Sequence, residues 1–129
     1  MCLDVVTANW TAQRIGWKVF RKNKQGKLES EFRRIDPNDT MPVGKWITDP
    51  MAGGTITELG VKYPNGFHIF LDKETAVTWA KHEWFRDGTR KLVVAKVKFR
   101  KTVAVGTEGC NVAVAQQIYI VPGTVRSYK

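Results

Sequence analysis

LVVAKVKFRKTVAV, residues 92–105, carries the clearest periodic pattern in the chain. Apolar side chains occupy nearly every second position, and basic side chains stand between several of them. Successive side chains of a β-strand point to opposite faces, so the pattern predicts a half-buried antiparallel strand that bends near Lys101. One face is predicted to carry Val93, Ala95, Val97, Phe99, Val103 and Val105, and the other Lys96, Lys98, Arg100 and Thr102.

Shorter apolar stretches on either side predict the other strands of the sheet. GWKVFRK (residues 16–22) and KLESEFRR (27–34) flank a polar turn with Gly26 and predict a β-hairpin. KWIT, GFHIFL and VAVAQQIYIV also have the composition of strands, and Pro122 and Gly123 end the last of them. The sequence therefore predicts a twisted, mainly antiparallel sheet of five or six strands.

One main helix is predicted after GFHIFL. Asp72 has the position of an N-cap, with Thr75 three residues later, and the helix should run from about Lys73 to Arg86. Gly88 is available for its C-terminal turn. Its buried face is predicted to carry Ala76, Trp79, Ala80 and Glu83. A sheet with one helix is an α+β fold, which we expect to form a single domain over residues 1–129.

The segment 35–60 is the exception to this regularity. Three prolines and the pair Gly53–Gly54 interrupt it, and only KWIT within it has the pattern of a strand. Long irregular segments in compact domains often bind ligands, so this is one place to look for a binding loop.

Composition narrows the class of partner. The chain of 129 residues has a formal net charge of +9, with 21 Lys and Arg against 12 Asp and Glu. This excess favours an anionic partner: nucleic acid, a nucleotide or an acidic protein surface. Cys2 and Cys110, beside only two histidines, show no disulfide framework or zinc spacing, which predicts a reduced cytoplasmic protein without a metal site. No apolar run approaches the roughly 20 residues that cross a bilayer, so no membrane association is expected.

The candidate ligand-binding residues follow from the charge pattern. Lys96, Lys98 and Arg100 should form a basic face, extended by Lys18 and Arg21 if their strand is a neighbour. The alternative is a solvated face whose lysines discourage edge pairing. His68 in GFHIF is a further candidate ligand-binding residue. The alternative for His68 is a structural role in which its side chain is hydrogen-bonded within the protein. The chain has no nucleophilic triad, Gly-rich phosphate loop or paired metal carboxylates, so we expect a binding protein without catalytic residues or cofactor.

Three short motifs carry a resemblance to known proteins. MCL at residues 1–3, WKV at 17–19 and GFHIF at 66–70, followed by Ala76, occur in an order that resembles a diffuse group of small phage and mobile-element proteins. The resemblance spans most of the chain and implies a small accessory protein in the cytoplasm of a host cell. It is consistent with an inhibitor of a host-defence component.

A second resemblance concerns the order of elements. An early strand, a later strand with its helix and a last strand are similar to ADP-ribosyltransferase-like folds, which bind NAD in a cleft between sheets. That similarity implies a site around Lys18 or Arg21, His68 and Gln117. Those enzymes use a late glutamate, whereas this chain has Gln116 and Gln117 in AVAQQIYI. A glutamine amide lacks the anionic charge, so the alternative is an NAD-using enzyme or a catalytically silent nucleotide-binding relative.

Overall fold

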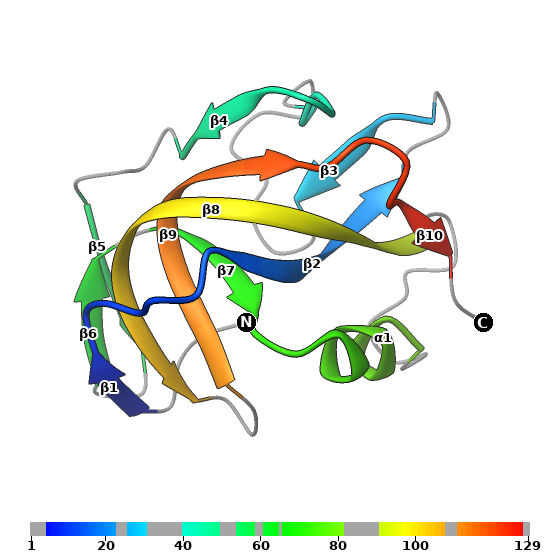
Figure 1. Cartoon of the computed structure of the whole chain (residues 1–129). Helices are drawn as coiled ribbons and strands as arrows, with labels where there is room; N and C mark the ends of the chain where they lie inside the picture. The colour runs from blue at the N-terminus through cyan, green and yellow to red at the C-terminus, as the bar shows by residue number, and fades with distance from the viewer. Residues whose placement is uncertain are drawn as a thin grey trace.

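The computed structural model describes residues 5–22, 26–30, 40–49, 54–58, 61–64, 66–81, 91–107 and 111–127. Within them the fold is α+β: an eight-stranded antiparallel sheet, a separate two-stranded sheet and one helix (Figure 1). The large sheet comprises β1 (Val5–Ala8), β2 (Ile15–Lys22), β3 (Leu28–Ser30), β4 (Trp46–Thr48), β7 (Phe67–Phe70), β8 (Lys91–Thr107), β9 (Asn111–Ile120) and β10 (Arg126–Ser127). The small sheet comprises β5 (Thr55–Glu58) and β6 (Val61–Pro64), and the helix is α1 (Lys73–Lys81).

The α+β class, the antiparallel sheet and the helix are confirmed, but the expected number of strands is wrong. The large sheet has eight strands where five or six were predicted. The strands that the sequence did not predict, β1, β5, β6 and β10, have only two to four residues each. In these four segments the sequence shows no apolar run or alternation that distinguishes a strand from a loop.

β8 is the longest strand, with 17 residues, and the sheet is organised around it. It pairs with β2 from Lys91 to Lys98 and with β9 from Val97 to Thr107. Because Val97 and Lys98 pair with both strands, β2 and β9 lie on opposite edges of β8. The short strands β1 and β10 pair with its two ends.

The predicted bend near Lys101 is confirmed. Lys101 has a φ of 58°, and the register with β9 shifts between Thr102 and Ala104. Both features disturb the alternation of faces, and β8 arches strongly in Figure 1. As a result Val103 packs with a different apolar cluster from Val105. Their predicted placement on one face is therefore wrong, because the strand does not alternate regularly through the bend.

The strands around β8 pair in a closed ring. β7 pairs along its whole length with residues 112–115 of β9, and it meets β2 at Phe70 and Trp17. Gly16 permits this last contact: a Cβ atom there would lie 2.5 Å from Cγ2 of Ile69 and 2.7 Å from the carbonyl oxygen of Phe70. A side chain of any size at residue 16 would hold the two strands apart.

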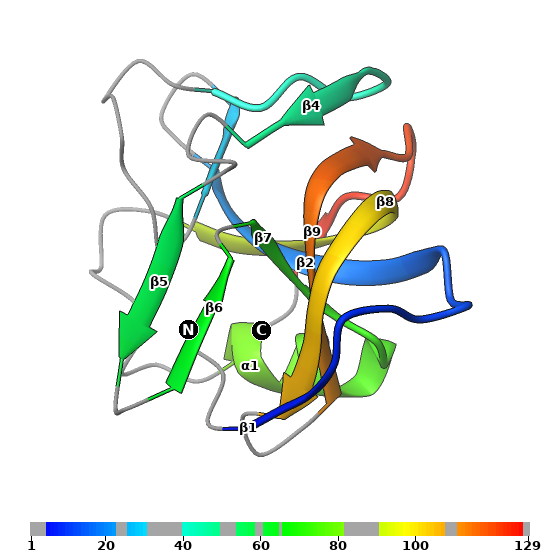
Figure 2. The same cartoon turned by 90° about the vertical axis from the view of Figure 1, so that its left-hand side faces the viewer.

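Two apolar clusters fill the two faces of the curved sheet. The first cluster includes Phe20, Ile69, Val97, Phe99 and Ile118, and Ile47 of β4 packs against it. The second cluster joins the sheet to α1 and β6 through Val19, Tyr63, Phe70, Ala76, Ala80, Leu92, Val94, Val112 and Val114. In both Figure 1 and Figure 2, β4 and α1 lie at opposite ends of the molecule. Each cluster is therefore covered from its own end.

The helix begins as predicted. Oδ2 of Asp72 accepts hydrogen bonds from the backbone N–H of Thr75 (3.0 Å) and from its hydroxyl (2.8 Å), which is N-cap geometry. Ala76 and Ala80 are buried, and Trp79 packs against Phe70 with ring centroids 5.8 Å apart. The predicted continuation to Arg86, with Glu83 on the buried face, lies outside the described residues.

Segment 35–60 is described at residues 40–49 and 54–58. The predicted strand KWIT is confirmed as β4, and β5 is an additional strand. Among the described residues, no helix has the length and apolar character that a membrane span requires.

Gly16→Ala should destabilise the fold. The added Cβ would overlap Ile69 and the Phe70 carbonyl, and overpacking of this kind costs about 1 to 3 kcal/mol. Urea unfolding followed by circular dichroism measures the change. Thr78→Ala at an exposed position of α1 is the control and should stay within about 0.5 kcal/mol of the original protein. Equal stability of the two variants would show that β2 and β7 need not approach closely.

Asp72→Ala should also destabilise the protein, by about 0.5 to 2 kcal/mol, because the first helical turn loses its cap. Asp72→Asn is the matched control, since an amide oxygen can accept the same bond, and it should retain most of the stability. Thermal unfolding compares the three proteins. A loss with Asn as large as that with Ala would assign the effect to the charge at the helix start.

Candidate anion-binding face

Three neighbouring strands, β8, β9 and β4, place cationic and aromatic side chains in two adjacent rows. In the first row Lys98 pairs with Tyr119, which pairs with Trp46. In the second row Arg100 pairs with Gln117, which pairs with Thr48. Residues directly opposite each other on antiparallel strands share a face, so each row lies on one surface. We call the surface formed by Trp46, Thr48, Lys96, Lys98, Arg100, Gln117 and Tyr119 the cationic face.

The second row holds the guanidinium of Arg100 in place. Its Nε–H donates to Oε1 of Gln117 (2.6 Å), and Nε2 of Gln117 donates to Oγ1 of Thr48 (2.9 Å). Its Cζ atom lies 3.9 Å from the centre of the Trp46 ring, a distance typical of a cation in contact with an indole face. The two Nη groups carry the remaining N–H donors, which suit bidentate binding of a phosphate or carboxylate. Arg100 is thus oriented before any ligand binds.

The first row repeats the association of a cation with a ring. Nζ of Lys98 lies 5.6 Å from the centre of the Tyr119 ring, and the rings of Tyr119 and Trp46 are 5.7 Å apart and tilted by 51°. Trp46 is 40% exposed, and Tyr119 is partly buried. Two aromatic rings and two cations therefore lie together on an exposed surface.

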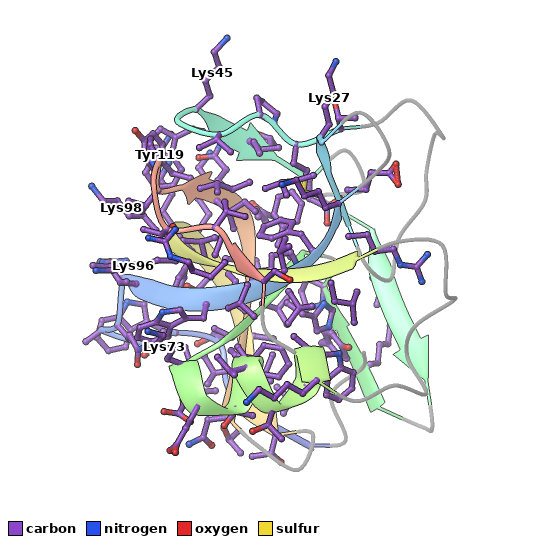
Figure 3. All side chains as sticks on the ribbon, turned by 90° about the vertical axis from the view of Figure 1, so that its right-hand side faces the viewer. Lys27, Lys45, Lys73, Lys96, Lys98 and Tyr119 are labelled. Atoms are coloured by element: carbon purple, nitrogen blue, oxygen red, sulfur yellow. The ribbon has the colours of Figure 1, made fainter. Side chains whose placement is uncertain are left out.

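Lys96 adds a third cation next to these rows. Its backbone is held on both sides, since its N–H donates to Oγ1 of Thr124 (3.1 Å) and its carbonyl accepts from the N–H of Val121 (3.0 Å). Figure 3 shows Lys98, Lys96 and Tyr119 on the same side of the molecule, with Lys45 above them and Lys73 below. The exposed Lys45 and Lys73 extend the positive charge beyond the two rows.

No acidic residue stands directly beside these cations on the flanking strands. The residues opposite Lys98 are Ile15 and Tyr119, and the residue opposite Arg100 is Gln117. Trp17 is opposite Lys96. The positive charges therefore add to one another locally, and a polyanion would meet them together.

The face of β8 that carries Lys96 and Lys98 is covered near the start of the strand. Leu92 and Val94 alternate in step with Lys96 and Lys98, but they are buried in the second cluster with α1 and Tyr63. Trp17, which packs against that cluster and is opposite Lys96, marks the border. The helix thus covers one half of the face and leaves the cationic half open.

Lys18 does not join the cationic face. It is opposite Ala95 on β8, so its side chain is directed to the first cluster, and it is only 6% exposed. Its ammonium group donates to the carbonyl of His68 (3.0 Å) and lies 5.8 Å from the ring centres of both Phe20 and Phe67. The expected support from Lys18 is therefore wrong: β2 is indeed the neighbour of β8, but the register turns Lys18 to the opposite face.

Arg21 lies on the same face of the sheet as Lys96, Lys98 and Arg100 but is distant from them. It is opposite Leu92 on β8 and opposite Glu29 on β3. The buried pair of Val19 and Val94 stands between it and Lys96. Arg21 therefore does not extend the row of Lys96, Lys98 and Arg100.

His68 has partners within the protein. It is opposite Val114 on β9, and its Nε2 shares a hydrogen bond of 3.0 Å with the hydroxyl of Tyr63. The two rings meet edge to face with centroids 5.8 Å apart. This geometry fits the structural role that was the alternative for His68.

The residues of the NAD-binding alternative do not face one cleft. The Lys18 side chain packs with the first cluster, His68 bonds to Tyr63 at the second, and Gln117 bonds to Arg100 on the cationic face. Gln117 is instead placed to orient Arg100. Of the seven candidate residues, the structure thus brings together Lys96, Lys98, Arg100 and Gln117.

Sequence reasoning did not include Trp46, Thr48 or Tyr119. Tyr119 could have been assigned to an exposed face, because it alternates with the buried Ile118 and Ile120. No sequence pattern indicates that β4 pairs with β9. The contact of Trp46 with Arg100 could therefore not be predicted from the sequence. Among the described residues, no group of three or more His, Cys, Asp and Glu side chains could hold a metal ion.

No family model, curated protein or solved structure matches this chain.

Proposed function

We propose that this protein is a non-enzymatic binding protein whose cationic face holds a polyanion. The observation that carries the proposal is the row of Lys96, Lys98 and Arg100, next to each other on an open surface without acidic neighbours on the flanking strands. Side chains two residues apart on a strand are separated by about 6.6 Å, so the three cations can contact successive charges of one extended polymer. Nucleic acid is the polyanion that this spacing suits best.

The arrangement of the cations also favours binding over a merely solvated surface. A lysine that only keeps an edge strand from aggregating has no need of fixed partners. Here Lys98 lies where β8 is paired with strands on both edges, and Arg100 is held by Gln117 and Trp46. Orienting a cation in advance reduces the entropy lost when an anion binds.

The net charge of +9 supports the same proposal at longer range. A positive surface accelerates encounter with a polyanion and provides affinity that falls steeply with salt. The expectation of a phage-type accessory protein that acts on a host-defence component stays a prediction, and a nucleic-acid partner is compatible with it.

Replacing Lys96, Lys98 and Arg100 together with Gln should weaken the binding of nucleic acid and reduce its salt dependence. Each phosphate contact that is lost should lower the slope of log K against log salt by about 0.7 to 0.9. Fluorescence anisotropy at several salt concentrations measures the slope. Stability should change little, because each exposed charge contributes less than about 1 kcal/mol.

The control variant removes the same amount of positive charge from lysines outside the cationic face. Lys22, Lys62 and Lys81 are exposed on β2, β6 and α1, and their triple Gln variant has the same net charge as the first variant. It should retain most of the salt slope. Equal slopes for the two triple variants would show that net charge alone drives binding and would contradict a defined face.

A further inference from the structure

We propose that the polyanion is a single-stranded nucleic acid whose bases stack on Trp46 and Tyr119 while its phosphates bind Lys96, Lys98 and Arg100. This rests on the proposed function and specifies its ligand. The aromatic rings are the observation that simple polyanion binding leaves unexplained, because an uncharged ring offers no electrostatic attraction to an anion.

The position of the rings supports stacking. Trp46 is 40% exposed although an apolar cluster lies on the other face of its own strand, where Ile47 packs. Tyr119 is in the same row and meets Trp46 at 51° with centroids 5.7 Å apart. The two rings adjoin each other beside the cations, so one flat partner can cover the accessible parts of both. A nucleobase is a flat partner with a π-face of suitable size.

Each ring lies next to a cation. Arg100 contacts Trp46, and Lys98 lies over Tyr119. Nucleotides present a flat base and an anionic phosphate at each step of the chain, and this alternation matches a surface on which rings and cations adjoin. Guanidinium planes stack on bases as aromatic rings do, so Arg100 can also contribute to stacking.

A duplex fits this surface less well. In a duplex the faces of the bases are covered by their neighbours, and only the base edges and the backbone are accessible. The cations could still contact phosphates, but Trp46 and Tyr119 would have no base faces to cover them. Single-stranded DNA and RNA share the required chemistry, so both are tested.

The experiment measures the binding of four fluorescent probes by anisotropy at several salt concentrations. These are oligo-dT and oligo-rU of about 12 nucleotides, within the usual site size, a DNA duplex of equal length, and heparin, a polyanion without bases. The variants are Trp46→Leu and Tyr119→Leu, which keep an apolar side chain at each position. Trp10→Leu is the matched control, because Trp10 is 62% exposed in the connection between β1 and β2, outside both rows.

We expect both single strands to bind more tightly than the duplex. Trp46→Leu and Tyr119→Leu should each weaken single-strand binding by about 5- to 150-fold, the effect of losing one stacked base. The salt slope should stay unchanged, because neither variant removes a charge. Heparin binding should fall much less than single-strand binding, because heparin loses only the contact that orients Arg100 or Lys98. Trp10→Leu should bind all four probes as the original protein does. Thermal unfolding by circular dichroism checks that each variant is folded.

Different results would overturn base stacking and polyanion binding. Equal affinity for single strand, duplex and heparin, insensitive to the ring variants, would overturn stacking and leave polyanion binding intact. An equal loss of heparin binding in the ring variants would also overturn it, since the effect would not involve bases. Absence of binding to all four probes at low salt would overturn both. If only one of oligo-dT and oligo-rU binds, the ring variants must weaken that probe, and oligo-dU then separates the effect of the 2′-hydroxyl from that of the thymine methyl group.

Discussion

The pairing of β8 on both of its edges is the constraint on which the rest of the fold depends. β2 and β9 flank it at Val97 and Lys98, and β7 joins those two strands to close the ring. β8 also changes direction along its length, and the positive φ of Lys101 and the following register shift mark the bend. β9 in turn pairs with β4, and these two registers determine which side chains adjoin Lys98 and Arg100.

One face of β8 serves two purposes because the helix covers only half of it. Leu92 and Val94 contribute to the second cluster beneath α1, whereas Lys98 and Arg100, in step with them, are exposed. Both halves have the same side-chain direction and differ only in what lies above them. The closely packed Ala76 and Ala80 bring α1 against the sheet, which secures the fold without occupying the cationic half.

Local sequence patterns predicted the elements that depend on neighbours in the chain. The hairpin of β2 and β3, the strand β7, the cap at Asp72 and the bend near Lys101 all arise from residues close in sequence. The buried alternation of Val93, Ala95, Val97 and Phe99 was predicted for the same reason. The strands β1, β5, β6 and β10 were missed, since local composition did not distinguish them from loops.

The sequence by itself determined the α+β class, the alternation of β8 and the presence of a basic row at Lys96, Lys98 and Arg100. Only the tertiary structure decided which residues share that face, because cross-strand register is a property of pairs of strands. Register turned Lys18 toward the core, and it placed Trp46, Tyr119 and Gln117 beside the cations. A shift of one residue would have exchanged those assignments, since side chains on a strand alternate between faces.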